Sequence, residues 1–357
     1  MEYFLAVSAE ATGFAAYFNN NILESFGLNL PKALQAGPLE GGVINLSAVL
    51  IVLVVALIIL HGASLSKKVE NVAVVIKVAI IIIFIAVGAF YIKTSNYVPF
   101  YPQQFQTSPL GLGGISTAAA TVFFAFIGFD ALAANSAETI NPEKNVVKGG
   151  ILGTVGVSVV LYVAFSFVLT GIVHYSKLNV DDPAAYALQV IHLNTWNKLI
   201  TIGALIGIFT SLITMFFGGS RLVYALGRDG LLPAKMGVVS TKHVVPKNAI
   251  LVATIVQAFF AGLVPLTELA SLINAGTLLA FAFISFGVIP LRKRHDIQNK
   301  GFKMPLYPVL PCIAGSLSVY FIIMLPNITK ISVGLWLVLG LVVYFGYGLR
   351  HSKLQNK

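Results

Sequence analysis

The sequence consists of long apolar runs separated by short polar stretches. A helix needs about 20 apolar residues to cross a bilayer, and ten runs qualify. They are 3–20, 43–61, 71–92, 115–137, 150–174, 198–225, 248–265, 268–290, 308–325 and 331–349. The first run carries Glu10 at its middle and is rich in Ala and Ser, which favours a helix packed inside a bundle. The pattern predicts an all-α polytopic membrane protein.

Composition narrows the class further. Of the 357 residues, 57% are hydrophobic and only 10% are charged. Soluble domains average about 25% charged residues, so this chain has too few charges to cover a soluble surface. A soluble enzyme and a disordered chain are therefore excluded. The single cysteine, Cys312, excludes a fold built on intrachain disulfides.

The basic residues predict the orientation of the chain. When loops are assigned alternately to two sides, one side holds 17 Lys and Arg residues and the other holds 5. Because basic loops stay in the cytoplasm, both termini are expected there, in a multi-pass protein of the cell (plasma) membrane. The net charge of +10 thus reflects topology and gives no reason to expect a nucleic-acid partner.

Two polar connections contain local structure signals. Residues 227–230 read Gly-Arg-Asp-Gly and are followed by Pro233, which predicts a helix end and a turn. Residues 181–193 begin with Asp-Asp-Pro and continue with apolar residues at helical spacing. This segment predicts a short helix on the outer face.

The fourth run contains a candidate binding site. It reads Phe-Ile-Gly-Phe-Asp at 126–130, with a Gly and an acid at about mid-membrane depth. A helix broken there would expose backbone groups that transporters use to bind substrates or ions. A tightly packed continuous helix, with Asp130 bonded to a neighbour, is the alternative.

Two further ionisable residues lie within apolar runs, and the sequence leaves two interpretations of each. Lys77 could extend to the interface, or it could lie in the bundle and exchange a proton. Glu10 could form a structural hydrogen bond or belong to a site. No histidine pair has metal-ligand spacing and no Walker A motif occurs, so neither a metal nor a cofactor is expected.

Four stretches resemble amino-acid permeases of the amino acid–polyamine–organocation superfamily. TVFFAFIGFDALAANSAETINPEKNVVKGGIL at 121–152 resembles the sixth helix and its loop, and SRLVYALGRDGLLP at 220–233 the end of the eighth. SKKVENVAVVIKVAIIIIFI at 66–85 resembles the fifth helix and EYFLAVSAEATGFAAYF at 2–18 the third. The resemblance is greatest to bacterial members similar to cationic amino acid transporters.

The resemblance implies a LeuT-like fold of two inverted five-helix repeats plus two helices, in one permease domain. The ten runs then correspond to family helices 3–12. Residues 1–92 are the remainder of the first repeat, 115–290 the second, and 308–349 the two additional helices. The first two family helices have no counterpart here, so we expect a chain that lacks them not to transport by itself.

Site roles also follow from the resemblance. Phe124 would be an aromatic gate over the substrate, and Asp130 would lie just past the break. Lys77 matches a lysine that replaces a sodium ion in proton-coupled members, and Met215 would shape the substrate pocket. Backbone around the substrate amino group would come from Ala125, Phe126, Ile127 and Gly128.

The expected function is therefore a permease for an amino acid, with a proton as coupling ion and the lipid bilayer as its environment. Two other classes stay open at this point. One is a membrane-embedded enzyme, such as an acyl or prenyl transferase, which would need acids or histidines clustered at one depth. The other is a non-transporting fragment or subunit that assembles with a partner.

Overall fold

A computed structural model describes residues 1–62, 67–101, 113–129, 141, 143–240, 245–294 and 304–352. Asp130 lies outside the described residues. All regular structure in these ranges is helical. The chain divides into two compact units whose segments alternate along the sequence. Unit 1 comprises 1–97, 167–270 and 334–357, and unit 2 comprises 98–166 and 271–333.

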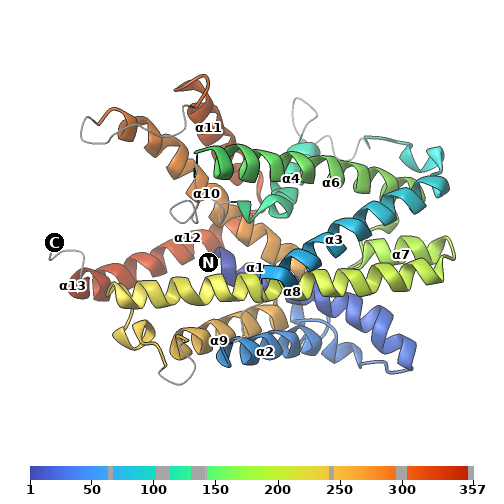
Figure 1. The fold of residues 1–357 in the computed structure, drawn as a ribbon, viewed down its shortest axis with the longest axis horizontal. Coiled ribbons are helices and arrows are strands. Elements are labelled where there is room, and N and C mark those ends of the chain that lie inside the picture. The colour runs from blue at the N-terminus through green and yellow to red at the C-terminus, as the bar shows by residue number, and fades with distance from the viewer. Residues whose placement is uncertain are drawn as a thin grey trace. The chain divides into compact units, whose positions relative to one another are not determined.

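Nine of the twelve α-helices in the described residues, all labelled in Figure 1, belong to one unit alone, and three are shared. Unit 1 contains α1 (Glu2–Tyr17), α2 (Leu46–Leu60), α3 (Lys67–Gly88), α7 (Pro183–Val190), α8 (Asn194–Arg228), α9 (Lys247–Leu263) and α13 (Leu349–His351). Unit 2 contains α4 (Gly113–Val122) and α11 (Val309–Met324). Three helices pass from one unit to the other: α6 (Gly153–Ile172), α10 (Leu266–Arg292) and α12 (Asn327–Val343).

Short 3₁₀ and π segments extend several of these helices. The π-helical segments are η1 (Phe18–Leu23), η10 (Glu143–Leu152) and η13 (Tyr344–Gly348). The 3₁₀ segments include η2 (Glu24–Phe26), η5 (Ala89–Tyr91), η8 (Phe123–Phe126), η11 (Tyr175–Lys177) and η12 (Ala234–Gly237). Segments η1, η8 and η10 directly continue or precede apolar helices, so these helices change geometry instead of ending in open loop.

Helix α1 lies at the core of unit 1, packed between α8, α2 and α9. Its fully buried face consists of small or β-branched side chains such as Val7, Ala11 and Ala15. Small side chains let neighbouring helices approach closely, which strengthens the dispersion contacts between them. These contacts matter in a membrane because the hydrophobic effect does not drive helices together in lipid. The prediction that the first run packs inside a bundle is confirmed.

Helix α2 shows how a polar residue sets a helix start. The side-chain oxygen of Asn45 accepts a hydrogen bond from the backbone N–H of Ala48 at 3.1 Å, which caps the first turn. The backbone N–H of Asn45 donates to the carbonyl of Gly262 at 2.8 Å. One residue therefore both starts α2 and attaches it to the end of α9.

Five helical segments are long and apolar enough to cross a membrane: Lys68–Tyr91, Asn145–Ile172, Asn194–Arg228, Leu266–Arg292 and Asn327–His351. Four shorter apolar helices accompany them within the described residues: Leu46–Leu60, Gly113–Phe126, Lys247–Leu263 and Val309–Met324. Each of the ten predicted runs contains a described helix. The count of ten spans and the inverted repeats stay predictions.

The helix predicted within 181–193 and the helix end predicted at 227–230 are both confirmed. The first forms α7, and α8 ends at Arg228 with Asp229 as its cap. The position of α7 on the outer face stays a prediction. Beyond this turn η12 folds back onto the end of α8. A Cβ atom placed on Gly227 would lie 2.6 Å from the backbone nitrogen of Gly237, so the two backbones touch. This close approach requires glycine at position 227, because the backbone of Gly237 cannot move aside for a Cβ atom as a flexible side chain could.

We therefore expect Gly227→Ala to destabilise the protein. Alanine stabilises a helix by about 1 kcal/mol relative to glycine. An extra methyl group forced into a tight contact destabilises the fold by about 1–3 kcal/mol, which outweighs this gain. The thermal unfolding midpoint in detergent should fall. Gly287→Ala on α10 is the matched control, because a Cβ there meets nothing within 4 Å. Equal midpoints for the two variants would contradict the backbone contact.

Candidate functional site

The predicted helix break at Gly128 is present. Helix α4 ends at Val122, η8 follows, and Ile127 is extended with ψ 142°. Gly128 has φ +116°, a conformation that a side chain would make strained. The prediction of non-helical backbone around Gly128 is confirmed, and the competing continuous helix is excluded.

Two polar side chains from other helices hold the backbone beside this break. The Tyr162 hydroxyl of α6 donates a hydrogen bond to the carbonyl of Ala125 at 2.8 Å. The Asn274 amide of α10 donates to the carbonyls of Ala120 at 2.9 Å and Thr121 at 2.7 Å. Sequence reasoning missed both residues. The available signal was Asn274 itself, an uncharged polar side chain inside the apolar run 268–290.

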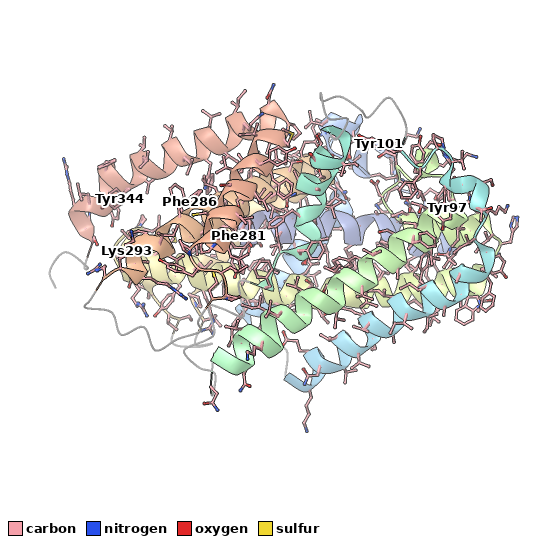
Figure 2. All side chains as sticks on the ribbon, turned by 90° about the horizontal axis from the view of Figure 1, so that it is seen from above. Tyr97, Tyr101, Phe281, Phe286, Lys293 and Tyr344 are labelled. Carbon is pink, nitrogen blue, oxygen red and sulfur yellow. The ribbon has the colours of Figure 1, made fainter. Side chains whose placement is uncertain are left out.

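Aromatic rings surround the break within unit 2. The Phe281 ring lies 6.0 Å from the Phe123 ring and 5.4 Å from the Phe129 ring, centroid to centroid. Phe126 meets Tyr162 edge to face at 5.3 Å. Figure 2 labels Phe281 on α10 among the side chains of this region. Phe124, on η8, is half-buried. The surroundings of the break are therefore largely apolar.

A second polar group lies in unit 1, where α1 meets α8. The Ser211 hydroxyl donates to Oε1 of Glu10 at 2.5 Å. Oε2 of Glu10 is buried and has no hydrogen-bond partner among the described residues. A buried carboxylate oxygen without a donor is costly unless the carboxyl carries a proton, so both interpretations of Glu10, a structural hydrogen bond and part of a site, stay open.

Lys77 of α3 belongs to the same polar group. Its aliphatic stem packs against α8, where a Cβ on Gly207 would lie 3.0 Å from Cγ of Lys77. Glu10 and Glu70 both interact electrostatically with the Lys77 ammonium group. Of the two interpretations of Lys77, this packing favours the one inside the bundle.

One face of α8 receives these side chains. Gly207, Ser211 and Thr214 follow one another at helical spacing and share that face. The Thr214 hydroxyl donates to Oε1 of Glu70 at 3.0 Å, one turn beyond the contact of Ser211 with Glu10. The α8 face thus offers a small residue to the lysine stem and hydroxyls to two carboxylates.

The other predicted site residues are distributed as follows. Met215 packs against the buried apolar cluster of unit 1, beside residues such as Leu212 and Phe216. Lys77 and Met215 belong to unit 1, and the segment 124–128 belongs to unit 2. Within the described part of the chain, no three His, Cys, Asp or Glu side chains gather in a way that could hold a metal ion.

A polar cavity of about 600 Å³ in unit 1 was not predicted. It is lined by Asn20, Asn21, Ile22, Glu24, Ser25, Gln189, Asn194, Asn197, Lys198, Thr201 and Ile202. Beside it, the Asn21 amide donates to Oδ2 of Asp182 at 2.8 Å. Gln189 and Asn197 both donate to Oδ1 of Asn21 at 3.3 Å. Asn21 therefore joins η1, α7 and α8 in one hydrogen-bond network.

Comparison with known proteins gives consistent matches along the chain. The family model for amino acid permeases matches residues 5–352. A methylthioribose transporter of Bacillus subtilis (strain 168) is 41% identical over 358 residues, covering 100% of this chain and 76% of the relative. The branched-chain amino acid permease BcaP of the same organism is 40% identical over 361 residues, with the same coverage. BcaP of Lactococcus lactis subsp. cremoris (strain MG1363) is 40% identical over 364 residues, covering 99% of this chain and 76% of the relative.

Asp182 gives a prediction for stability against pH. Burial raises the pKa of this carboxyl above its usual value, and the hydrogen bond from Asn21 opposes the rise. A raised pKa in the folded state means that this group stabilises the fold when protonated. The stabilisation is lost as the pH rises through the folded-state pKa. Asp182→Asn should therefore unfold at a higher temperature than the original protein at neutral pH, with a difference that disappears in acid.

The control for this experiment is Asp181→Asn. Asp181 is exposed, and its charge contributes less to the raised pKa of Asp182 than burial does. Its substitution should change the pH dependence of the unfolding midpoint much less. A temperature difference between Asp182→Asn and the original protein that is constant from pH 4 to pH 8 would contradict the assignment.

Proposed function

Because the chain belongs to the amino acid permease family, we propose that it carries a neutral amino acid with an apolar side chain across the cell membrane. Membership of this family makes it a membrane transporter and not the membrane-embedded enzyme considered above. The observation that carries the proposal is the helix break at Gly128.

The substrate would bind at this break. Interrupted membrane helices present backbone carbonyls and half-helix ends, which suit the charged groups of an amino acid. The segment Ala125–Gly128 would face the ammonium group, Phe124 would close over the substrate, and Asp130 would follow the break. The aromatic rings around the break support a substrate with an apolar side chain.

The names of the relatives support two substrate classes. Two of them are called branched-chain amino acid permeases, which agrees with an apolar side chain in an aromatic surrounding. A relative of equal similarity is called a methylthioribose transporter, so a neutral thiosugar is the second candidate. The two classes differ in charge, since only the amino acid has an ammonium and a carboxylate group for the helix ends.

Coupling to protons would use Glu10 and Lys77. A proton that enters or leaves this buried group changes the charge on the α8 face, where Ser211 already bonds the carboxylate. The free Oε2 of Glu10 is a place for that proton. Lys77 would supply the positive charge that a sodium ion supplies in other transporters. The chain would have the LeuT-like arrangement of inverted repeats, ten membrane spans and both termini in the cytoplasm.

Uptake by proteoliposomes tests the substrate. Residues 1–357 are reconstituted alone and also preceded by the first two helices of a family member, which tests whether uptake needs those helices. Labelled leucine, isoleucine, valine and methylthioribose are offered separately. We expect saturable uptake of a branched-chain amino acid by the protein that includes the first two helices, and none by residues 1–357 alone. Gly128→Ala should reduce this uptake at least about tenfold, which is equivalent to 1.4 kcal/mol or more.

The matched control is Gly287→Ala, which adds the same methyl group at an open helix position. It should transport like the original protein. Uptake of methylthioribose without uptake of any amino acid would reject the amino-acid substrate and support the thiosugar. The proposed site would be overturned if both proteins lacked saturable uptake, or if the two glycine variants showed equal uptake.

The proton-coupling proposal has a separate test. Lys77→Met and Glu10→Gln should lose accumulation driven by an inward proton gradient but keep exchange of substrate at equal concentrations, since the substrate site is left intact. Lys330→Met is the control, because Nζ of Lys330 donates to the carbonyl of Ile323 within unit 2. Gradient-driven accumulation by both variants at the level of the control would exclude this pair as the coupling site.

A further inference from the structure

We propose that Tyr162 and Asn274 are positioning residues that hold the Gly128 break in its non-helical form. They act by donating hydrogen bonds to the three carbonyls of Ala120, Thr121 and Ala125. The inference rests on the proposed function only in making the break the substrate site. The backbone role itself follows from the contacts.

The need for such donors comes from the backbone. In a continuous α-helix each carbonyl accepts a hydrogen bond from the N–H four residues later. The change to 3₁₀ geometry at Phe123 and the extended Ile127 disturb this pattern for the residues before Gly128. Where lipid or packed protein surrounds a break, no water replaces the lost donors, and the carbonyls need side chains from neighbouring helices.

Tyr162 is fitted to serve one of these carbonyls. Its ring packs edge to face on Phe126 with 5.3 Å between centroids, which fixes the direction of its hydroxyl. The hydroxyl then reaches the carbonyl of Ala125, one residue earlier in the same 3₁₀ segment. The ring and the hydroxyl of Tyr162 therefore contact two consecutive residues of η8, Phe126 and Ala125.

Asn274 serves the other two carbonyls. The side chain is 0% exposed, and its single NH₂ group donates to both Ala120 and Thr121 at the end of α4. Its Oδ1 is buried and has no hydrogen-bond partner within the part of the chain that the structure describes. The reverse amide orientation would direct this oxygen at two carbonyl oxygens, so the donor assignment is the favourable one. The Asn274 amide nitrogen therefore bonds the end of α4, while the amide oxygen of the same side chain makes no hydrogen bond to any described residue.

Two neighbouring polar residues have different partners and provide matched controls. The Tyr320 hydroxyl of α11 meets the Ser116 hydroxyl in the first half of α4 at 2.7 Å, away from the break. The Thr277 hydroxyl, less than one turn after Asn274, donates to the carbonyl of Ile273 in its own helix at 3.0 Å. Both are polar residues of unit 2 that touch no carbonyl at the end of α4 or in η8.

The test measures hydrogen exchange of backbone amides in residues 121–129 and, separately, uptake kinetics. Tyr162→Phe keeps the ring contact and deletes only the hydroxyl. Asn274→Leu keeps the approximate volume without donors, and Asn274→Asp is acceptor-only when ionised. We expect each variant to exchange about three- to tenfold faster in this segment. KM should rise by a similar factor with a smaller change in maximal rate.

The control variants Tyr320→Phe and Thr277→Val should leave both the exchange in 121–129 and KM unchanged. If Asn274→Leu fails to fold, the result for Tyr162→Phe alone tests the inference, because this substitution removes only one oxygen atom and should not prevent folding. Unchanged exchange in Tyr162→Phe overturns the inference even where the original protein transports. Faster exchange in a protein that shows no uptake supports the positioning role and instead rejects the proposed function.

Discussion

The backbone hydrogen-bond requirement inside a membrane is the constraint on which the break depends. Lipid offers no donors, so a helix can be interrupted only where neighbouring side chains or a water-filled cavity satisfy the freed carbonyls. At Gly128 the positive φ ends the helical path, and donors from α6 and α10 reach the carbonyls just before it. The break is therefore a property of three helices and not of the glycine alone.

The α8 face in unit 1 meets a different requirement. There the ionisable side chains of Glu10, Glu70 and Lys77 lie among apolar helices and need polar partners. Gly207 leaves room for the stem of Lys77, and Ser211 donates to Glu10. The single ammonium group interacts with two carboxylates, which limits the net charge that the bundle must hold. Small and hydroxyl residues in one row thus make buried charge tolerable.

The sequence predicted the helices and the position of the break but not the side chains that support it. Apolar length determines where a helix can span, and a Gly beside an acid within such a run shows where it weakens. Tyr162 and Asn274 lie 37 and 154 residues away from the carbonyls they serve. Contacts at such distances depend on how helices pack, and no local pattern encodes them. The polar cavity near Asn21 was missed for the same reason.

A polar residue within an apolar helix is therefore informative only through its partner. Thr254, Thr277 and Ser318 donate to the carbonyl four residues earlier in their own helices, which satisfies the hydroxyl and requires no neighbour. Ser211 and Asn274 reach across to another helix instead. In sequence these residues look alike, because all are single uncharged polar side chains in apolar surroundings. Only the second kind ties the conformation of one helix to the position of another, and a transporter whose helices must move can use that connection.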